Sequence, residues 1–343
     1  MPRSTPIPTV LRIDVEPDEQ QPKVGERPWD GFLAMSDMIE TLRRRLGDAT
    51  GHAVCPTWMI RLDPDVERAF GRTDFPVRRH QDLFNRIVKH VDTLGIHIHA
   101  LRWNTKKGVV FSDFADEAWC TECLRVAAST FQSCFGAPPP VVSFGGGFMR
   151  DSLLDAAVDL GIRADVTVEP GLAAKHQDPS FGAYSTAPSG NFLRCPRLPY
   201  YPSRMAFDTP ATSAEDVRPL LMVPLTSCDP RPLLKRLHRR LMRRQRPGYE
   251  PLNPWKIWPS PQTFWDLAWR AADELRAPYL AFALRSEAPN TDMYRRVSEL
   301  FDYLPRHSIG KRIRIVDPLS PEIESLAGPR LFEWPATPIR AQL

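Results

Sequence analysis

Short apolar, β-branched runs alternate with longer stretches of helical periodicity along most of the chain. Strands are predicted at residues 9–16, 52–60, 96–101, 140–147, 163–169, 219–227, 279–286 and 312–316. Helices are predicted at residues 31–48, 75–95, 114–136 and 149–161. Alternation of this length favours a parallel sheet with crossover helices, and this number of strands favours a (β/α) barrel over an open sheet.

Composition narrows the class of protein without identifying it. The 343 residues are 42% hydrophobic and 25% charged, which is typical of a globular protein with a large core. The net charge of +4 gives no indication of a nucleic-acid partner. The chain shows neither a signal-type apolar segment near residue 1 nor a run of roughly 20 apolar residues, so we expect a soluble, cytoplasmic protein.

Two cysteines are spaced as in some metal and redox sites. Cys120 and Cys123 form a C-x-x-C inside a predicted helix, where helix packing is favoured over a zinc or redox role.

The chain is predicted to form one (β/α)-barrel domain over residues 1–343, with a proline-rich and basic excursion at about 204–262. Within it, the basic helix at 231–246 is interpreted either as a solvated face or as a dock for an anionic surface or polymer.

Two pairs of polar residues alternate along predicted strands. Asp14 and Glu16, like His97 and His99, are separated by one residue, so each pair shares a face of its strand. Both pairs lie near strand ends, where a parallel barrel carries its active site. They predict a divalent metal held by Glu16, His97 and His99, with ligand atoms within about 5 Å of one another. The alternatives are a carboxylate pair that caps a turn and core histidines with local hydrogen bonds.

A triple glycine occupies residues 145–147, at the end of a predicted strand. It lacks the spacing of a dinucleotide-binding fingerprint. We interpret it as a strand end where close approach of the backbone matters.

Several stretches resemble the motifs of the polysaccharide deacetylase superfamily, the NodB-homology group of carbohydrate esterase family 4. The stretches are "RIDVEPDEQ", "LGIHIHALRW", "PPPVVSFGGGFMRDSLLDAAVDLGIRADVTVEPG" and "YLAFALRSEAPN", in family order, with "PTWMIRLDPDV" at the second strand. The resemblance covers roughly residues 11–320. It implies a distorted (β/α) barrel of about seven strands, of the glycoside hydrolase/deacetylase type.

The resemblance also implies roles for individual residues. Asp14 is the expected base, while Glu16 and His97 are expected to bind zinc or a similar divalent ion. The second family histidine would fall at Leu101, and His99 is its substitute. A glycine of "SFGGG" replaces the usual arginine, and Leu284 replaces the histidine that acts as acid. We expect Leu284 to face the cleft.

The missing acid leaves three candidates, Arg285, Glu287 and Glu169. An arginine holds its proton at neutral pH, so Arg285 would only stabilise charge or bind substrate at the strand end. Glu287 is predicted to be catalytic, and Glu169 is predicted to bind substrate or to act as acid if buried. The alternative for each is a structural salt bridge.

Further residues are predicted to bind a carbohydrate substrate. Trp103 and Tyr200 offer aromatic faces near strand ends, and Arg61 and Asp63 follow the second strand. The sequence thus favours a metal-dependent deacetylase-like hydrolase acting on an N-acetylated or O-acylated carbohydrate in surface-glycan biosynthesis. One alternative is a catalytically impaired, carbohydrate-binding or scaffold relative on the same barrel. Another is a metal-dependent hydrolase of a different amide.

Overall fold

The structure is a computed structural model that describes residues 5–18, 29–176, 184–231, 248–275, 277–286 and 291–334. The basic segment predicted at 231–246 lies outside these ranges except for Arg231, and Glu287 also lies outside them. The division into one barrel domain with an excursion at about 204–262 stays a prediction.

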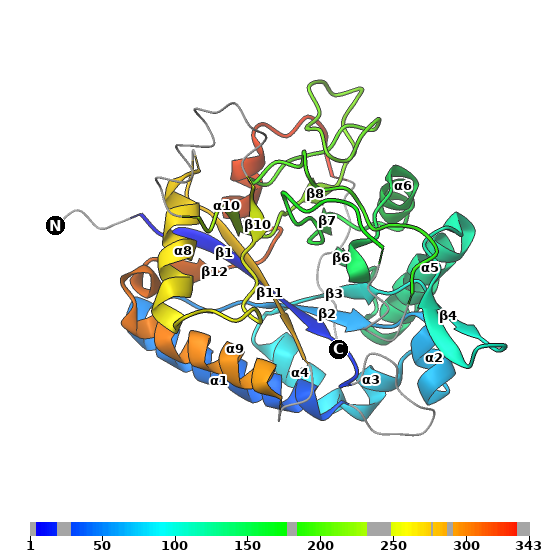
Figure 1. Cartoon of the computed structure of the whole chain (residues 1–343), viewed down its shortest axis with the longest axis horizontal. Coiled ribbons are helices and arrows are strands. Elements are labelled where there is room, and N and C mark those ends of the chain that lie inside the picture. Colours follow the sequence, from blue (N-terminus) through cyan, green and yellow to red (C-terminus); the bar gives the residue numbers. More distant parts are fainter. Residues whose placement is uncertain are drawn as a thin grey trace.

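A curled sheet of parallel strands forms the centre of the molecule (Figure 1). Its order is β11-β1-β2-β3-β6-β7-β8, and β12 also pairs with the start of β1. The strands are β1 (Ile7–Val15), β2 (Thr57–Arg61), β3 (Thr93–Ile98), β6 (Val141–Phe144), β7 (Ala164–Asp165), β8 (Leu221–Met222), β11 (Leu280–Arg285) and β12 (Ile313–Ile315). The predicted distorted (β/α) barrel is confirmed.

Helices cover the outer face of this sheet. In Figure 1, α1 and α9 run side by side along one flank, α8 stands next to them, and α5 and α6 lie at the other end. The helices are α1 (Asp30–Thr50), α2 (Pro64–Phe70), α3 (Phe75–Arg79), α4 (Gln81–Lys89), α5 (Glu117–Phe135), α6 (Asp151–Asp159), α8 (Pro261–Asp273), α9 (Asp292–Tyr303) and α10 (Pro321–Glu324). Among the described helices, none is long and apolar enough to cross a membrane.

The alternation of β1 assigns its two faces. Leu11, Ile13 and Val15 belong to the large hydrophobic cluster that also contains residues of the outer helices. Val10 belongs to a second cluster, made by the inward faces of the strands. Arg12, Asp14 and Glu16 continue the inward face, because successive side chains of a strand point to opposite sides. The polar side chains of β1 and of Glu16 therefore lie on the inner face of the curled sheet, next to a layer of apolar residues.

Two departures from the predicted elements lie on either side of β3. The helix predicted at 75–95 is two shorter helices, α3 and α4, and Val91 with φ 62° separates α4 from β3. A hairpin that the pattern did not predict, β4 (Leu101–Asn104) with β5 (Val109–Ser112), follows β3. Its turn is built by Asn104, whose side-chain oxygen accepts from two backbone N–H groups, and by Gly108 with φ 63°.

A small two-stranded unit lies outside the main sheet. It consists of β9 (Ser227–Cys228) and β10 (Glu250–Pro251), which pair antiparallel. The single strand predicted at 219–227 is thus divided between β8 and β9. Pro224, which has no N–H to donate to a ladder, lies between the two pieces.

Candidate functional site

The inward faces of β1, β2, β3 and β6 meet at the carboxyl ends of the strands. Arg61 on β2 is in register with His97 on β3, and His97 is in register with Ser143 on β6. Glu16 follows the last residue of β1, and His99 follows the last residue of β3. Parallel strands end at one edge of the sheet, so these side chains converge there.

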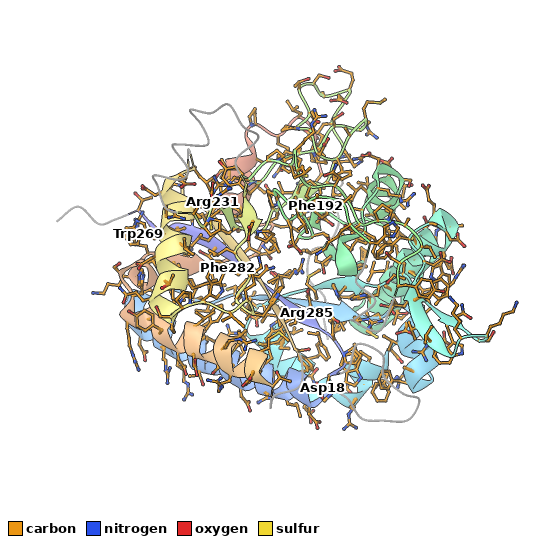
Figure 2. All side chains as sticks on the ribbon, viewed as in Figure 1. Asp18, Phe192, Arg231, Trp269, Phe282 and Arg285 are labelled. Carbon is orange, nitrogen blue, oxygen red and sulfur yellow. The ribbon has the colours of Figure 1, made fainter. Side chains whose placement is uncertain are left out.

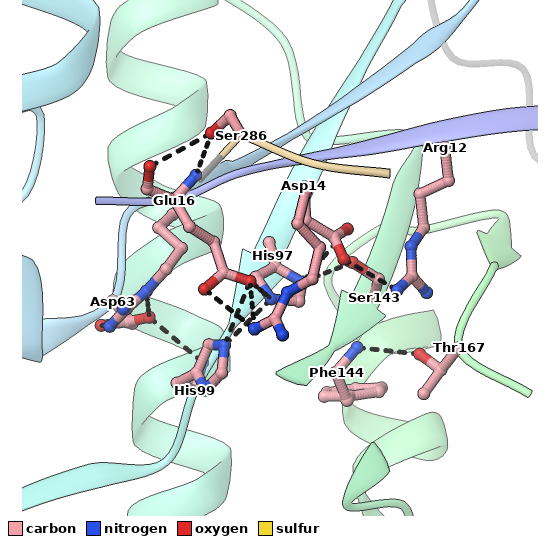
Figure 3. Close-up of polar contacts among 12 residues, drawn as sticks. Arg12, Asp14, Glu16, Asp63, His97, His99, Ser143, Phe144, Thr167 and Ser286 are labelled. Atoms are coloured by element: carbon pink, nitrogen blue, oxygen red, sulfur yellow. Dashed lines mark hydrogen bonds and ion pairs between the residues drawn. The ribbon is translucent and has the colours of Figure 1, made fainter. Parts of the chain in front are cut away.

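Glu16, His97 and His99 turn toward one another (Figure 3). His97 Nε2 lies 3.0 Å from Glu16 Oε1 and 3.0 Å from His99 Nε2, and His99 Nε2 lies 3.7 Å from Glu16 Oε1. The three ligand atoms lie within 4.8 Å of one another, inside the limit expected from the sequence. They are also the one such group of histidine, cysteine and acidic residues in the described part of the chain.

This set of atoms fits a divalent ion. Tetrahedral ligands about 2.0–2.1 Å from zinc stand about 3.3 Å apart, and the measured separations of 3.0–3.7 Å bracket that value. Ser143 Oγ lies 2.7 Å from His97 Nδ1, an outer partner of the kind that leaves Nε2 for a metal. Glu16, His97 and His99 would hold the ion and leave a further position for substrate or water.

The ionisation states of these side chains also suit the binding of a metal ion. Burial, with Arg61 nearby, lowers the pKa of His99 and favours the neutral imidazole that metals require. Burial alone would raise the pKa of Glu16, but Arg285 and the two histidines hold it well below its ordinary value. A neutral imidazole and an ionised carboxylate are thus the preferred forms.

Asp14 lies beside this group and is held by an arginine that the sequence did not single out. Arg12 Nη2 lies 2.8 Å from Asp14 Oδ2, and Arg12 Nη1 donates to the carbonyl of Val166 at 2.6 Å. Asp14 Oδ1 is buried, has no hydrogen-bond partner among the described residues, and lies 3.6 Å from His97 Nδ1. The sequence offered one clue to this role of Arg12, because residues 12 and 14 share a face of their strand.

Arg61 and Asp63 form a buried ion pair just outside Glu16, His97 and His99. Arg61 Nη2 lies 2.9 Å from Asp63 Oδ1 and 3.2 Å from Asp65 Oδ2. Asp63 Oδ2 also accepts the backbone N–H of His99 at 3.1 Å. With side chains 1% and 0% exposed, Arg61 and Asp63 position the turn that carries His99, and direct substrate contact by either stays a prediction.

Strand β11 contributes Arg285. Its Nη2 lies 3.4 and 3.5 Å from the two carboxylate oxygens of Glu16, and Figure 2 shows the residue near the middle of the molecule. Leu284 instead belongs to the large cluster on the helix side, together with Phe282. The expectation that Leu284 faces the cleft is therefore wrong. Because β11 alternates, Ala281, Ala283 and Arg285 take the inward face.

The remaining predicted residues lie at different depths. Burial raises the pKa of Glu169, which follows β7 and feels the charges of Arg12 and Asp14. Tyr200 is buried and donates its hydroxyl to the carbonyl of Phe207 at 2.7 Å. Trp103 on β4 is 46% exposed. Substrate binding by each of them stays a prediction.

Among the described residues, no cysteine belongs to a group of side chains that could hold a metal ion. Cys120 and Cys123 are both buried on α5, and Cys120 Sγ donates to the carbonyl of Asp113 at 3.5 Å. Burial raises the pKa of both thiols, which favours the neutral form of a packed side chain. This agrees with the helix-packing interpretation.

Comparison with known proteins bears on the fold. No family model matches the sequence. No curated protein matches it either. Similar solved structures include a candidate glycoside hydrolase/deacetylase from Parabacteroides distasonis, at 14% identity and a TM-score of 0.52, covering 92% of this chain and 70% of that one. A candidate polysaccharide deacetylase from Mycobacterium smegmatis aligns at 11% identity and a TM-score of 0.51, covering 98% and 97%. The chain therefore has the barrel fold of deacetylase-type proteins.

Proposed function

We propose that this protein is a metal-dependent, deacetylase-like hydrolase that acts on an N-acetylated or O-acylated carbohydrate in surface-glycan biosynthesis. The observation that supports this most is the convergence of Glu16, His97 and His99, with Asp14 beside them, at the carboxyl ends of parallel strands. The names of similar solved structures support the carbohydrate as substrate class.

The chemistry follows from the donor set. When bound, a divalent ion polarises an acyl carbonyl and lowers the pKa of water. Asp14 is the base that accepts the water proton, because its Oδ1 has no bonded partner among the described residues and Arg12 fixes its other oxygen. Hydrolysis breaks the C–N bond, so that the acyl carbon gains the hydroxyl and the nitrogen gains a proton.

The leaving amine needs a proton donor. Glu169 is suited to this role because burial raises its pKa and favours the protonated carboxyl. Glu287, which lies outside the described residues, is the alternative predicted from sequence. Arg285 supplies fixed positive charge next to Glu16 and does not donate a proton.

The cysteines bear on the cellular setting of the protein. All six cysteines are free, which fits the reducing cytoplasm. An anionic surface or polymer as partner of the basic segment at 231–246 remains a prediction from sequence alone.

Acetate release from N-acetylated oligosaccharides, with zinc, cobalt or manganese added, tests the activity. The wild type should release acetate, while Asp14→Asn should lose at least about 10²-fold in kcat, the size of a general-base contribution. Arg43→Lys is a matched control, because Arg43 pairs with Asp92 outside the site. If the protein instead hydrolyses an amide that is not an N-acetylated carbohydrate, the result would support the alternative of a metal-dependent hydrolase of a different amide.

A specific observation favours a second function, that of a carbohydrate-binding relative without turnover. Arg285 contacts the same carboxylate that would bind the ion, and Leu284, at the family's acid position, faces the helices. A protein of this kind would bind N-acetylated oligosaccharides and release no acetate with any of the three metals.

A further inference from the structure

Gly145 lies directly under the imidazole of His99. It follows β6 and begins η1 (Gly145–Gly147). A β-carbon placed on Gly145 would lie 2.1 Å from His99 Nε2, 2.3 Å from Cε1 and 2.4 Å from Cδ2. These distances are far below van der Waals contact, so the imidazole occupies the volume that any other residue at 145 would need.

The register of two strands explains this contact. Ile98 on β3 pairs with Phe144 on β6, so His99 and Gly145 are the next positions along neighbouring parallel strands. Side chains at such positions share one face and stand close together. Residue 145 must lack a side chain if the imidazole at position 99 is to point toward Glu16.

We propose that Gly145 is a positioning residue that makes the H-x-H metal site possible, by leaving room for the ring of His99. The inference rests on the proposed function only in taking Glu16, His97 and His99 as ligands for a divalent cation. It adds that His99 and residue 145 form a dependent pair, in which any side chain at 145 removes the His99 ligand.

The surroundings indicate which group moves when residue 145 gains a side chain. Gly145 does not adopt a left-handed φ, unlike Gly146 with φ 69°, so alanine fits its backbone. The backbone of His99 is held by Asp63, whereas its ring is a side-chain end with two rotatable torsions. The ring, and not the strand, is therefore the part that yields.

A double-mutant cycle with zinc as the probe tests this pair. Zinc affinity is measured by competition with a chromogenic chelator for wild type, Gly145→Ala, His99→Ala and the double variant. Gly145→Ala should weaken zinc binding about 10–100-fold, the scale seen when groups that orient ligands are removed. In the His99→Ala background the same change should have almost no effect, because the ring is already absent. Gly47→Ala is the control, since a β-carbon there meets only the His52 carbonyl oxygen, at 3.8 Å.

Two further readouts separate the outcomes. The visible absorption of the cobalt-loaded protein should change in Gly145→Ala, and a crystal structure of that variant should show the His99 ring out of contact with Glu16. Failure of the wild type to bind zinc or cobalt would contradict the proposed function and, with it, the premise that Glu16, His97 and His99 hold a divalent ion. An unmoved His99 ring in Gly145→Ala, or equal zinc affinity in wild type and variant, would overturn the role of Gly145.

Discussion

Arg12 and Asp14 form an ion pair within a single strand, with Arg12 Nη2 2.8 Å from Asp14 Oδ2. The same guanidinium crosses the interior of the curl from β1 to the carbonyl of Val166, which follows β7. It therefore fixes one oxygen of the carboxylate and turns the other toward His97 Nδ1, 3.6 Å away. The anchoring of Arg12 at Val166 thus fixes the orientation of the Asp14 carboxylate.

Replacing Arg12 should impair catalysis more than substrate binding. In Arg12→Lys the charge stays but the planar fork that reaches both Asp14 and Val166 is lost, so kcat should fall about 10²-fold with little change in KM. Steady-state kinetics of acetate release measure both constants. Added guanidinium ion should partly restore kcat in Arg12→Ala. A large rise in KM with unchanged kcat would contradict the positioning of Asp14 by Arg12.

Loss of Arg61 should destabilise the fold. Arg61→Met leaves the buried carboxylates of Asp63 and Asp65 without their shared cation, and the free energy of unfolding should fall by about 3–5 kcal/mol. The matched control is Arg45→Met, since the pair of Arg45 with Asp302 is exposed and its loss should cost less than about 1 kcal/mol. Urea unfolding compares the two. Equal, small losses would show that the buried network contributes little.

The buried carboxyl of Asp165 should make stability depend on pH. Burial raises its pKa to about 7 in the folded protein, from an ordinary value of 3.8. As pH rises from about 4 to about 7 the unfolded chain releases this proton first, so the contribution of Asp165 to stability falls over that window and is constant above it.

The comparison variant is Asp165→Asn, which has nearly the same shape and no charge to lose. The unfolding free energy of the wild type, minus that of the variant, should decrease on going from about pH 4 to about pH 7. Urea unfolding at a series of pH values measures this difference. A difference that is independent of pH would show that the pKa of Asp165 is ordinary in the folded protein, and a difference that increases would show that folding lowers this pKa.

Trp103 should contribute to binding of a polymer. It is 46% exposed on β4, and the Arg68 guanidinium lies 5.4 Å from its ring centroid. Trp103→Ala should raise KM for an N-acetylated oligosaccharide about 3–10-fold, from the loss of a stacking surface, with kcat unchanged. Met205→Ala, at another exposed apolar residue, is the control. An unaltered KM would leave Trp103 without a part in substrate binding.

Local alternation predicted much of the site. His97 and His99 needed only the period of a strand to be placed on one face, and the same holds for Asp14 and Glu16. The edge where they meet followed from the parallel order of the strands. These features depend on short stretches of sequence, which is why they could be predicted without knowing how distant segments pair.

Contacts between distant segments could not be predicted in this way. The approach of His99 to Gly145 depends on the register of β3 with β6, and the side on which Leu284 lies depends on where β11 begins relative to β1. A shift of one residue reverses every side chain of a strand, so "YLAFALRS" alone did not decide between Leu284 and Arg285. The hairpin after β3 was missed because Leu101 continues the apolar run of that strand.

Metal stoichiometry tests the central claim most directly. Purified wild-type protein is loaded with zinc, freed of excess by gel filtration and analysed by mass spectrometry, in parallel with His97→Ala. We expect close to one zinc per chain in the wild type and almost none in His97→Ala, with both proteins folded by circular dichroism, because His97 Nε2 stands 3.0 Å from each of the other ligand atoms. Equal zinc content in the two proteins would contradict a metal centre at Glu16, His97 and His99.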